Sequence, residues 1–191
     1  KSGKVGFVGG MEIPLIKKFY AGYVAGVKTA NPAAEVLPAK YTGSWNDTGL
    51  GKLAAQALYG GGADIVFHAA GRCGLGVFEA AKESGKYAIG VDSDQDAEQP
   101  GLILTSMIKR VDEAVYQTIK DVRDGAFTPG DKVYDLKANG VGLSEMKFTK
   151  ATIGEAALKK IGEARQKIIS GEIVVPTDDS SLAKYLAGLK K

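Results

Sequence analysis

The sequence predicts an α/β domain built on a doubly wound parallel sheet, and three observations support this prediction. Short apolar runs alternate along the chain with longer segments whose apolar residues recur at helical spacing. The runs, such as Val5–Val8 and Asp64–His68, are apolar almost throughout, which is typical of strands buried on both faces of a parallel sheet. Glycine is abundant, with 26 of 191 residues, and it clusters where the runs and helices end.

The first half of the chain repeats a strand followed by a helix. Asp47 is a favourable N-cap for one helix, and Asn31-Pro32 ends another. The apolar spacing predicts these elements in order: a strand over Val5–Val8, a helix over Leu15–Val27, a strand over Glu35–Tyr41, a helix over Asp47–Gly60, a strand over Asp64–His68, a helix that opens at Gly71–Gly76, and a strand over Tyr87–Val91.

The second half is less regular, but the same signals apply. They predict a strand over Leu102–Met107, a helix over Val111–Val122 that Gly125 ends, a strand over Lys132–Leu136, a turn at Asn139-Gly140, a short segment Val141–Leu143, and a long helix from Ile153 to Ser170-Gly171. The polar segment Thr177–Ser181 is expected to be loose, with a short helix over Leu182–Leu189 as the alternative.

Composition and charge argue against several classes of protein. The net charge is +3 without a basic stripe, which argues against nucleic-acid binding. A single cysteine, Cys73, excludes an internal disulfide and a cysteine-rich zinc site. No apolar run approaches the roughly 18–20 residues of a membrane span.

The sequence offers little support for catalysis, for a metal or for a cofactor. The only histidine, His68, follows no Gly-x-Ser-x-Gly elbow, and Cys73 lies five residues beyond it with no third group to orient the pair. The glycines at 71, 74 and 76 do not have the spacing of the dinucleotide fingerprint. We therefore expect no catalytic residues, no metal and no cofactor.

Ligands of an open parallel sheet bind beyond the carboxyl ends of its strands, so the residues there are candidates for binding. The Asp92 carboxylate could accept hydrogen bonds from a vicinal diol, and Lys109 could donate to a third oxygen. A turn or cap is an equally good interpretation of Asp92, and a turn is the better interpretation of Asp94. His68 could face the crevice or be a satisfied core histidine, and Trp45 could contact a ligand or cover the sheet.

Five ordered motifs carry a resemblance to a known family. They are Val5–Gly10, Tyr41–Asp47, Gly62–Gly71, Ile89–Gln95 and Leu104–Asp112, with Gly140-Val141-Gly142 after them. Together they resemble the basic membrane protein family of bacterial surface lipoproteins, the family of the purine nucleoside receptors. The match reaches most of the chain and fades in its tail.

The resemblance implies a type I periplasmic-binding-protein fold, in which two α/β lobes close on a nucleoside and deliver it to the permease of an ABC importer. It implies that Asp92 holds the ribose hydroxyls and that Lys109 reaches the sugar. It places an aromatic contact at or beside His68 and lets the glycine turn Gly71–Gly74 line the pocket. Trp45 and Asp94 complete the expected set of ligand-binding residues.

The resemblance also implies that this chain is the second lobe and carries half of the binding site. The expected divisions are a lobe over 1–108, a crossover helix over 109–131 that packs on the missing first lobe, a return strand and helix over 132–176, and a polar tail over 177–191. Alone, the chain is expected to bind nucleoside weakly or not at all, and to form a homodimer through its exposed apolar face. A lipid on a missing N-terminal cysteine would anchor the protein at the bacterial cell surface or in the periplasm.

Two alternatives remain open. One is an α/β enzyme that acts on nucleosides with Asp92 or Cys73, and the other is an intracellular regulator of the same fold.

Overall fold

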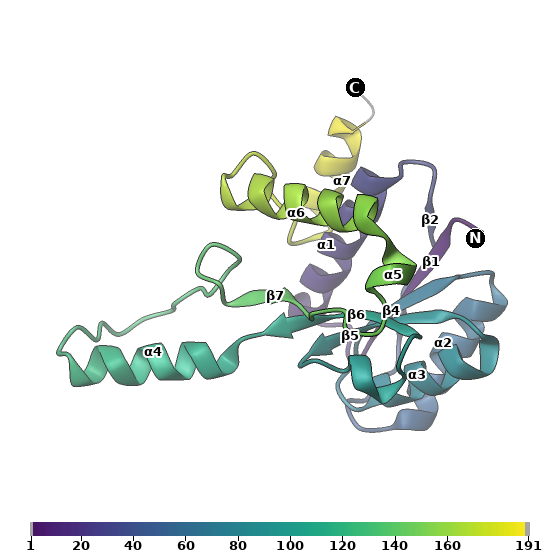
Figure 1. Cartoon of the computed structure of the whole chain (residues 1–191), viewed down its shortest axis with the longest axis horizontal. Coiled ribbons are helices and arrows are strands. Elements are labelled where there is room, and N and C mark those ends of the chain that lie inside the picture. The colour runs from purple at the N-terminus through teal and green to yellow at the C-terminus, as the bar shows by residue number, and fades with distance from the viewer. Residues whose placement is uncertain (1, 190–191) are drawn as a thin grey trace.

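The computed structural model describes residues 2–189, which form one seven-stranded sheet with helices on both faces (Figure 1). The strands are β1 (Lys4–Gly9), β2 (Glu35–Val36), β3 (Lys40–Tyr41), β4 (Ile65–Ala69), β5 (Tyr87–Asp92), β6 (Ile103–Lys109) and β7 (Val141–Leu143). The helices are α1 (Pro14–Ala30), α2 (Thr48–Gly60), α3 (Cys73–Ser84), the 3-10 turn η1 (Asp96–Glu98), α4 (Val111–Arg123), α5 (Lys150–Ile153), α6 (Glu155–Ile169) and α7 (Asp179–Gly188).

The strand order confirms the doubly wound parallel sheet. The order is β2-β1-β4-β5-β6-β7, and β3 also pairs with β1. All pairs are parallel except β6 with β7. The chain moves to one side of β1 for β2 and β3 and to the other side for β4. This reversal of strand order creates a crevice at the carboxyl ends of β1 and β4, where ligands of such sheets bind.

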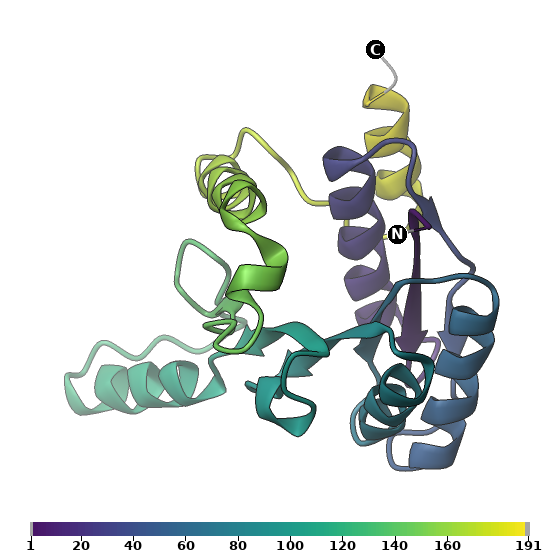
Figure 2. The same ribbon diagram turned by 45° about the vertical axis from the view of Figure 1, so that its right-hand side comes forward.

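The two faces of the sheet are buried under different helices, as the apolar strands required. Helices α2 and α3 cover one face and α1 covers the other (Figure 2). Consecutive residues of β1 show this directly: Phe7 packs with the residues of α1, whereas Val8 packs with Leu58 and Val77 of α2 and α3. Both Phe7 and Val8 are fully buried.

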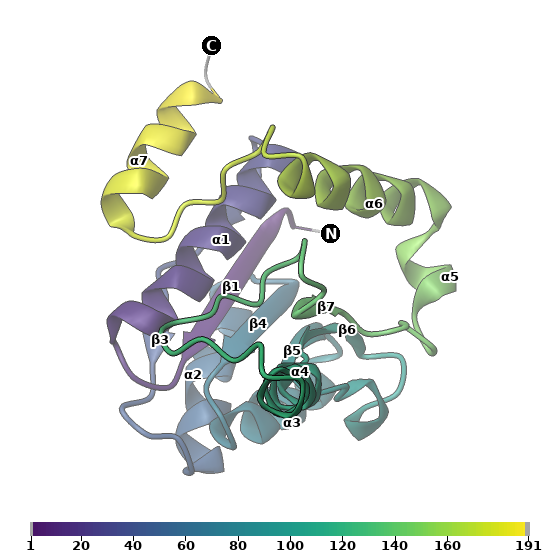
Figure 3. The same ribbon diagram turned by 90° about the vertical axis from the view of Figure 1, so that its left-hand side faces the viewer.

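Helix α4 does not share this packing. It projects away from the sheet in Figure 1 and points toward the viewer in Figure 3. None of its residues is buried. Helix α6 likewise has no buried residue.

One predicted strand was wrong and a second was wrong in part. No strand forms over Lys132–Leu136, because this segment lies along the projecting α4, away from the sheet (Figure 1). Its lysine instead contacts that helix, with Lys132 Nζ 2.8 Å from Asp121 Oδ2. The strand expected over Glu35–Tyr41 is divided into β2 and β3 around Pro38, which has no N–H to donate to a ladder.

The end of the chain is also more ordered than expected. The loose segment predicted at Thr177–Ser181 contains a capping box: Asp178 Oδ1 accepts from the Ser181 N–H, and Ser181 Oγ accepts from the Asp178 N–H. The helix α7 that follows packs on α1, where Leu182 is buried. The long helix predicted from Ile153 forms as α6, which begins at Glu155 because Gly154 separates it from the short α5.

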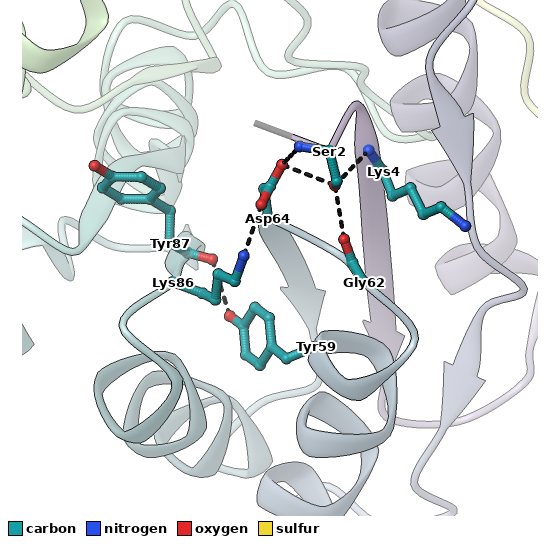
Figure 4. Close-up of polar contacts among 7 residues, drawn as sticks. All are labelled: Ser2, Lys4, Tyr59, Gly62, Asp64, Lys86 and Tyr87. Atoms are coloured by element: carbon teal, nitrogen blue, oxygen red, sulfur yellow. Dashed lines mark hydrogen bonds and ion pairs between the residues drawn. The ribbon is translucent and has the colours of Figure 1, made fainter.

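The amino ends of the strands are held together around Asp64 (Figure 4). Its carboxylate accepts hydrogen bonds from the Ser2 N–H, from Ser2 Oγ at 2.8 Å and from Lys86 Nζ at 2.8 Å. Nearby, the Tyr59 hydroxyl donates to the carbonyl oxygen of Tyr87 at 2.9 Å. The contacts with Lys86 and Ser2 hold the pKa of the Asp64 carboxyl well below its usual range. This structural cluster lies at the sheet edge opposite the crevice.

Candidate functional site

A hollow of about 320 Å³ lies at the carboxyl ends of β4 and β5. The segment after β4 and the end of β5 with its following turn form its walls. The residues that line it are Gly71, Arg72, Leu75, Val91, Asp92, Ser93 and Gln95. The hollow therefore lies at the carboxyl edge of the sheet, beside the crevice between β1 and β4.

Asp92 and Lys109 converge at this edge, as the sequence predicted. Strands β5 and β6 are parallel neighbours with Asp92 opposite Ile108, which places Lys109 one residue further at the same edge. The Lys109 ammonium lies 2.9 Å from Asp92 Oδ1. The side chains are 54% (Asp92) and 37% (Lys109) exposed. An ion pair this exposed contributes ~0–1 kcal/mol to stability, so a ligand can compete for both groups at little cost.

Lys109 has a second neighbour that fixes its position. Its ammonium lies 4.9 Å from the centre of the Phe19 ring of α1, a distance typical of a cation–π contact. The cation is therefore held between a carboxylate from the sheet and an aromatic ring from the covering helix.

Trp45 lies across the top of the sheet, over the crevice between β1 and β4. Its ring packs directly on Gly10, where an added Cβ would lie only 2.4 Å from the ring carbons. Its carbonyl oxygen accepts a hydrogen bond from the Arg72 N–H at 2.8 Å, which ties the Trp45 loop to the segment that walls the hollow. Trp45 remains 38% exposed. It covers the sheet and still presents part of its indole ring to solvent.

His68 lies below this surface. The side chain is fully buried, its ring meets Phe78 edge-on at 5.0 Å, and Nε2 lies 3.1 Å from Gln95 Oε1. Burial lowers the pKa of His68 to about 4, so the ring is neutral at pH 7. The ring is therefore in the core, but it is not fully satisfied there, because Nδ1 has no hydrogen-bond partner within residues 2–189. Direct contact with a ligand stays a prediction that would require the ring to become exposed.

The expected glycine turn divides in the same way. Gly71 lines the hollow, whereas Gly74 is buried against the His68 ring. A Cβ added at Gly74 would lie only 2.0 Å from a carbon of that ring. Asp94 behaves as a turn residue, since its Oδ1 accepts a hydrogen bond from the Asp96 N–H at 3.0 Å. Neither Gly74 nor Asp94 lines the hollow.

Four further residues line the hollow although the sequence predicted no binding role for them: Arg72, Leu75, Ser93 and Gln95. Arg72, Ser93 and Gln95 lie in the segments that follow β4 and β5, where the strand ends predicted ligand contacts, and Leu75 lies in the first turn of α3. Ser93 and Gln95 belong to the motif Ile89–Gln95, but strand-end position alone does not show which side chains of these segments face the hollow.

The contacts of His68 and Cys73 test the thiol pair that the sequence allowed. His68 and Cys73 do not form a catalytic pair: Cys73 Sγ donates to the carbonyl oxygen of Ser44, while His68 contacts Gln95. Within residues 2–189, no three acidic, histidine or cysteine side chains come close enough to bind a metal ion. Over the same residues, none of the helices has the length and apolar character that a membrane span requires.

Comparison with known proteins then decides the family. A sequence profile named Bmp, described as "ABC transporter substrate-binding protein PnrA-like", matches residues 1–179. The chain belongs to this PnrA-like family. The resemblance predicted from the five motifs is thereby confirmed.

Relatives within the PnrA-like family are longer than this chain. The chain is 38% identical over 195 residues to the "ABC transporter nucleoside-binding protein BmpA" of Lactococcus lactis, an alignment that covers 93% of this chain and 54% of that protein. The chain spans about half the length of the curated relatives it matches.

Two solved structures resemble the chain closely. An ABC transporter solute-binding protein from Aeropyrum pernix superimposes with a TM-score of 0.83 at 32% identity, over 98% of this chain and 61% of that one. A transcriptional activator of the comK gene from Bacillus halodurans gives 0.78 at 27% identity, over 88% of this chain and 57% of that one. The PnrA-like fold thus occurs in both a transport component and a regulator.

Proposed function

We propose that this chain is the lobe of an ABC importer's substrate-binding protein that grips the sugar of a purine nucleoside. The observation that carries the proposal is the 2.9 Å approach of Lys109 to Asp92 at the edge of the hollow. The PnrA-like family membership and a relative named as nucleoside-binding support it.

The chemistry of the pair suits a ribose. An ionised carboxylate accepts only, so Asp92 can receive the O–H groups of the 2′ and 3′ hydroxyls together. An ammonium donates only, so Lys109 can supply the hydrogen bonds that the same sugar oxygens accept. Because both groups are charged, each bond is about twice as strong as its neutral equivalent.

We assign the aromatic contact with the base to Trp45 rather than to His68. The indole is partly exposed above the crevice, whereas the imidazole is fully buried and packs against Gly74. Base stacking on an aromatic ring contributes about 1–3 kcal/mol. Gly71, which lines the hollow, lets the ligand approach the backbone closely.

A second lobe would close the site, and α4 supplies its docking face. Five apolar side chains of this helix are each more than half exposed: Val111, Val115, Tyr116, Ile119 and Val122. The relatives are nearly twice as long as this chain, which supports a first lobe of the same protein as the occupant of this face. The assembled protein would deliver its ligand to a permease from the bacterial surface or periplasm, held there by a lipid anchor.

The docking proposal can be tested on residues 1–191 alone. Without the first lobe, the α4 face is expected to pair with a second copy, and Ile119→Asp is expected to restore a monomer in light scattering. Glu113→Ala, on the polar side of the same helix, is the matched control and should leave the dimer intact. A chain that stays monomeric at high concentration would contradict the docking role of α4.

Binding is tested by calorimetry with the protein expressed from its complete gene. Guanosine should bind one-to-one. The affinity for 2′-deoxyguanosine should be at least about tenfold lower, because one charge-assisted hydrogen bond is lost. Asp92→Asn should weaken guanosine by about the same factor or more, whereas Asp94→Asn, two residues along the same turn, should not. Equal affinities in Asp92→Asn and the unmodified protein would overturn the proposal. Residues 1–191 alone should bind weakly or not at all.

A regulator that senses the same ligand is the second candidate, because the comK activator shares the fold at 27% identity. The two candidates differ in the segment that is fused to the lobes. A DNA-binding segment encoded by the complete gene would favour the regulator, and a lipidated cysteine would favour the receptor. Under both, inosine incubated with the protein should stay intact. Release of hypoxanthine would instead favour an enzyme.

A further inference from the structure

We propose that Gln95 is a positioning residue, which with Ser106 and Asp96 behind it holds Asp92 ready for the ligand. The proposal rests on the proposed function of Asp92 as the group that receives the sugar hydroxyls. It assigns a role to a buried polar cluster that lies directly under the hollow.

Gln95 closes the turn that carries Asp92. Its side-chain Oε1 accepts a hydrogen bond from the Val91 N–H at 2.8 Å, and its backbone N–H donates to Ser106 Oγ at 3.0 Å. One residue therefore ties the end of β5, before the turn, to the neighbouring β6. Gln95 Oε1 also lies 3.1 Å from His68 Nε2, which links the turn to β4.

A second layer fixes Ser106 in turn. Ser106 Oγ donates to Asp96 Oδ1 at 2.7 Å, and the Ser106 N–H donates to Ser144 Oγ at 3.0 Å. Ser106 is fully buried and Asp96 is 2% exposed. Hydrogen bonds this far from water are strong, and the loss of one partner leaves another group unsatisfied. The cluster is therefore a rigid support for the turn.

Asp92 needs such a support because its backbone is in an unfavourable conformation. Its φ is +70°, in the left-handed region that residues with a Cβ rarely adopt. Surrounding contacts must hold such a residue in place. Ser106 and Gln95 pack closely against the strand that leads to Asp92. A Cβ added at Gly90 would lie 2.6 Å from Ser106 Oγ and 3.0 Å from Gln95 Oε1.

The orientation of the Asp92 carboxylate depends on this backbone. The Asp92 side chain is more than half exposed to water and forms an ion pair with Lys109. If the turn relaxed to an ordinary φ, the carboxylate would leave the position from which it faces Lys109. Preorganisation of this kind raises affinity because the ligand does not have to order the group that binds it.

The first test is structural and needs no ligand. Gln95→Met keeps the length of the side chain and removes the acceptor for the Val91 N–H. Hydrogen exchange of the Val91 amide should accelerate about tenfold, the effect of one lost hydrogen bond. In a crystal structure of the variant, Asp92 should leave the left-handed region and lose its contact with Lys109. Gln99→Met, the same substitution four residues on, is the matched control.

The second test separates positioning from direct contact, because Gln95 itself lines the hollow. In calorimetry with the complete gene product, Gln95→Met should weaken guanosine binding about tenfold. In an Asp92→Gly background, which tolerates φ +70° and has no carboxylate to position, the same substitution should change affinity less than about twofold.

The outcomes distinguish the two proposals. An equal loss of affinity in both backgrounds would overturn positioning and make Gln95 a contact residue. If Asp92 in Gln95→Met keeps its positive φ and its 2.9 Å contact with Lys109, positioning is also overturned. If the unmodified protein binds no nucleoside, the proposed function fails, and the structural test still decides whether Gln95 holds Asp92.

Discussion

The sheet with its covering helices and the projecting helix α4 are opposite cases of burial within one chain. Phe7, in the middle of β1, is completely buried between the sheet and α1. Tyr116, in the middle of α4, is 64% exposed although the helix is amphipathic. Apolar periodicity therefore predicts an amphipathic helix, but it does not predict whether the apolar face of that helix packs within the same part of the chain.

The largest expected effect is a difference between these two aromatic residues. Phe7→Ala should lower the free energy of unfolding by about 3–5 kcal/mol, because it removes a buried ring and leaves a cavity. Tyr116→Ala should change it by less than about 0.5 kcal/mol in residues 1–191 kept monomeric by Ile119→Asp. Urea denaturation of the two variants measures both. Comparable losses would mean that α4 is packed in solution and would break the comparison.

The next effect concerns pH and distinguishes the two edges of the sheet. The pKa of His68 is about 4 when folded and about 6.5 when unfolded, so the unfolded chain binds the extra proton first as the pH falls. Stability should therefore be complete above pH 6.5 and decline by about 3 kcal/mol toward pH 4. Denaturation across this range should show the decline, and His68→Gln should flatten it.

Asp64, at the opposite edge, has a lowered pKa, so its contribution should be lost only below about pH 4, as the carboxylate is protonated. Asp64→Asn should remove the acid sensitivity in that lower range and leave the His68 range unchanged. A profile in which either variant alters both ranges would show that the two edges do not titrate independently.

A smaller effect should come from two glycines with different surroundings. Gly74→Ala should destabilise the chain by about 1–3 kcal/mol, because the new methyl group would lie 2.0 Å from the buried His68 ring. Gly162→Ala, in the exposed helix α6 with open space around it, should stabilise it by about 0.5–1 kcal/mol. Thermal denaturation of the pair checks the signs, and a stabilising Gly74→Ala would contradict the packing at His68.

The central parallel strands and their helices could be predicted because the signals for them are local. Apolar runs, glycine stops and the Asp47 cap specify β1, β4, β5 and α1–α3 with little help from distant residues. The convergence of Asp92 and Lys109 was also predictable, since parallel neighbours end at the same edge of a sheet.

What could not be predicted depends on long-range contacts. The side of the sheet that His68 faces could not be predicted, because β4 is buried on both faces. In such a strand the sequence shows no alternation of apolar and polar residues that would tell the two faces apart. Lys132–Leu136 has a strand-like pattern but no neighbour to pair with. The contacts of Gln95 exist only because β4, β5 and β6 bring His68, Val91 and Ser106 around it.

The most direct test of the central claim is a crystal structure of the complete gene product soaked with guanosine. The account predicts that the ribose lies at the carboxyl ends of β5 and β6, with its 2′ and 3′ hydroxyls within hydrogen-bond distance of Asp92 and a sugar oxygen within reach of Lys109. Guanosine bound elsewhere, with the ion pair undisturbed at 2.9 Å, would contradict it.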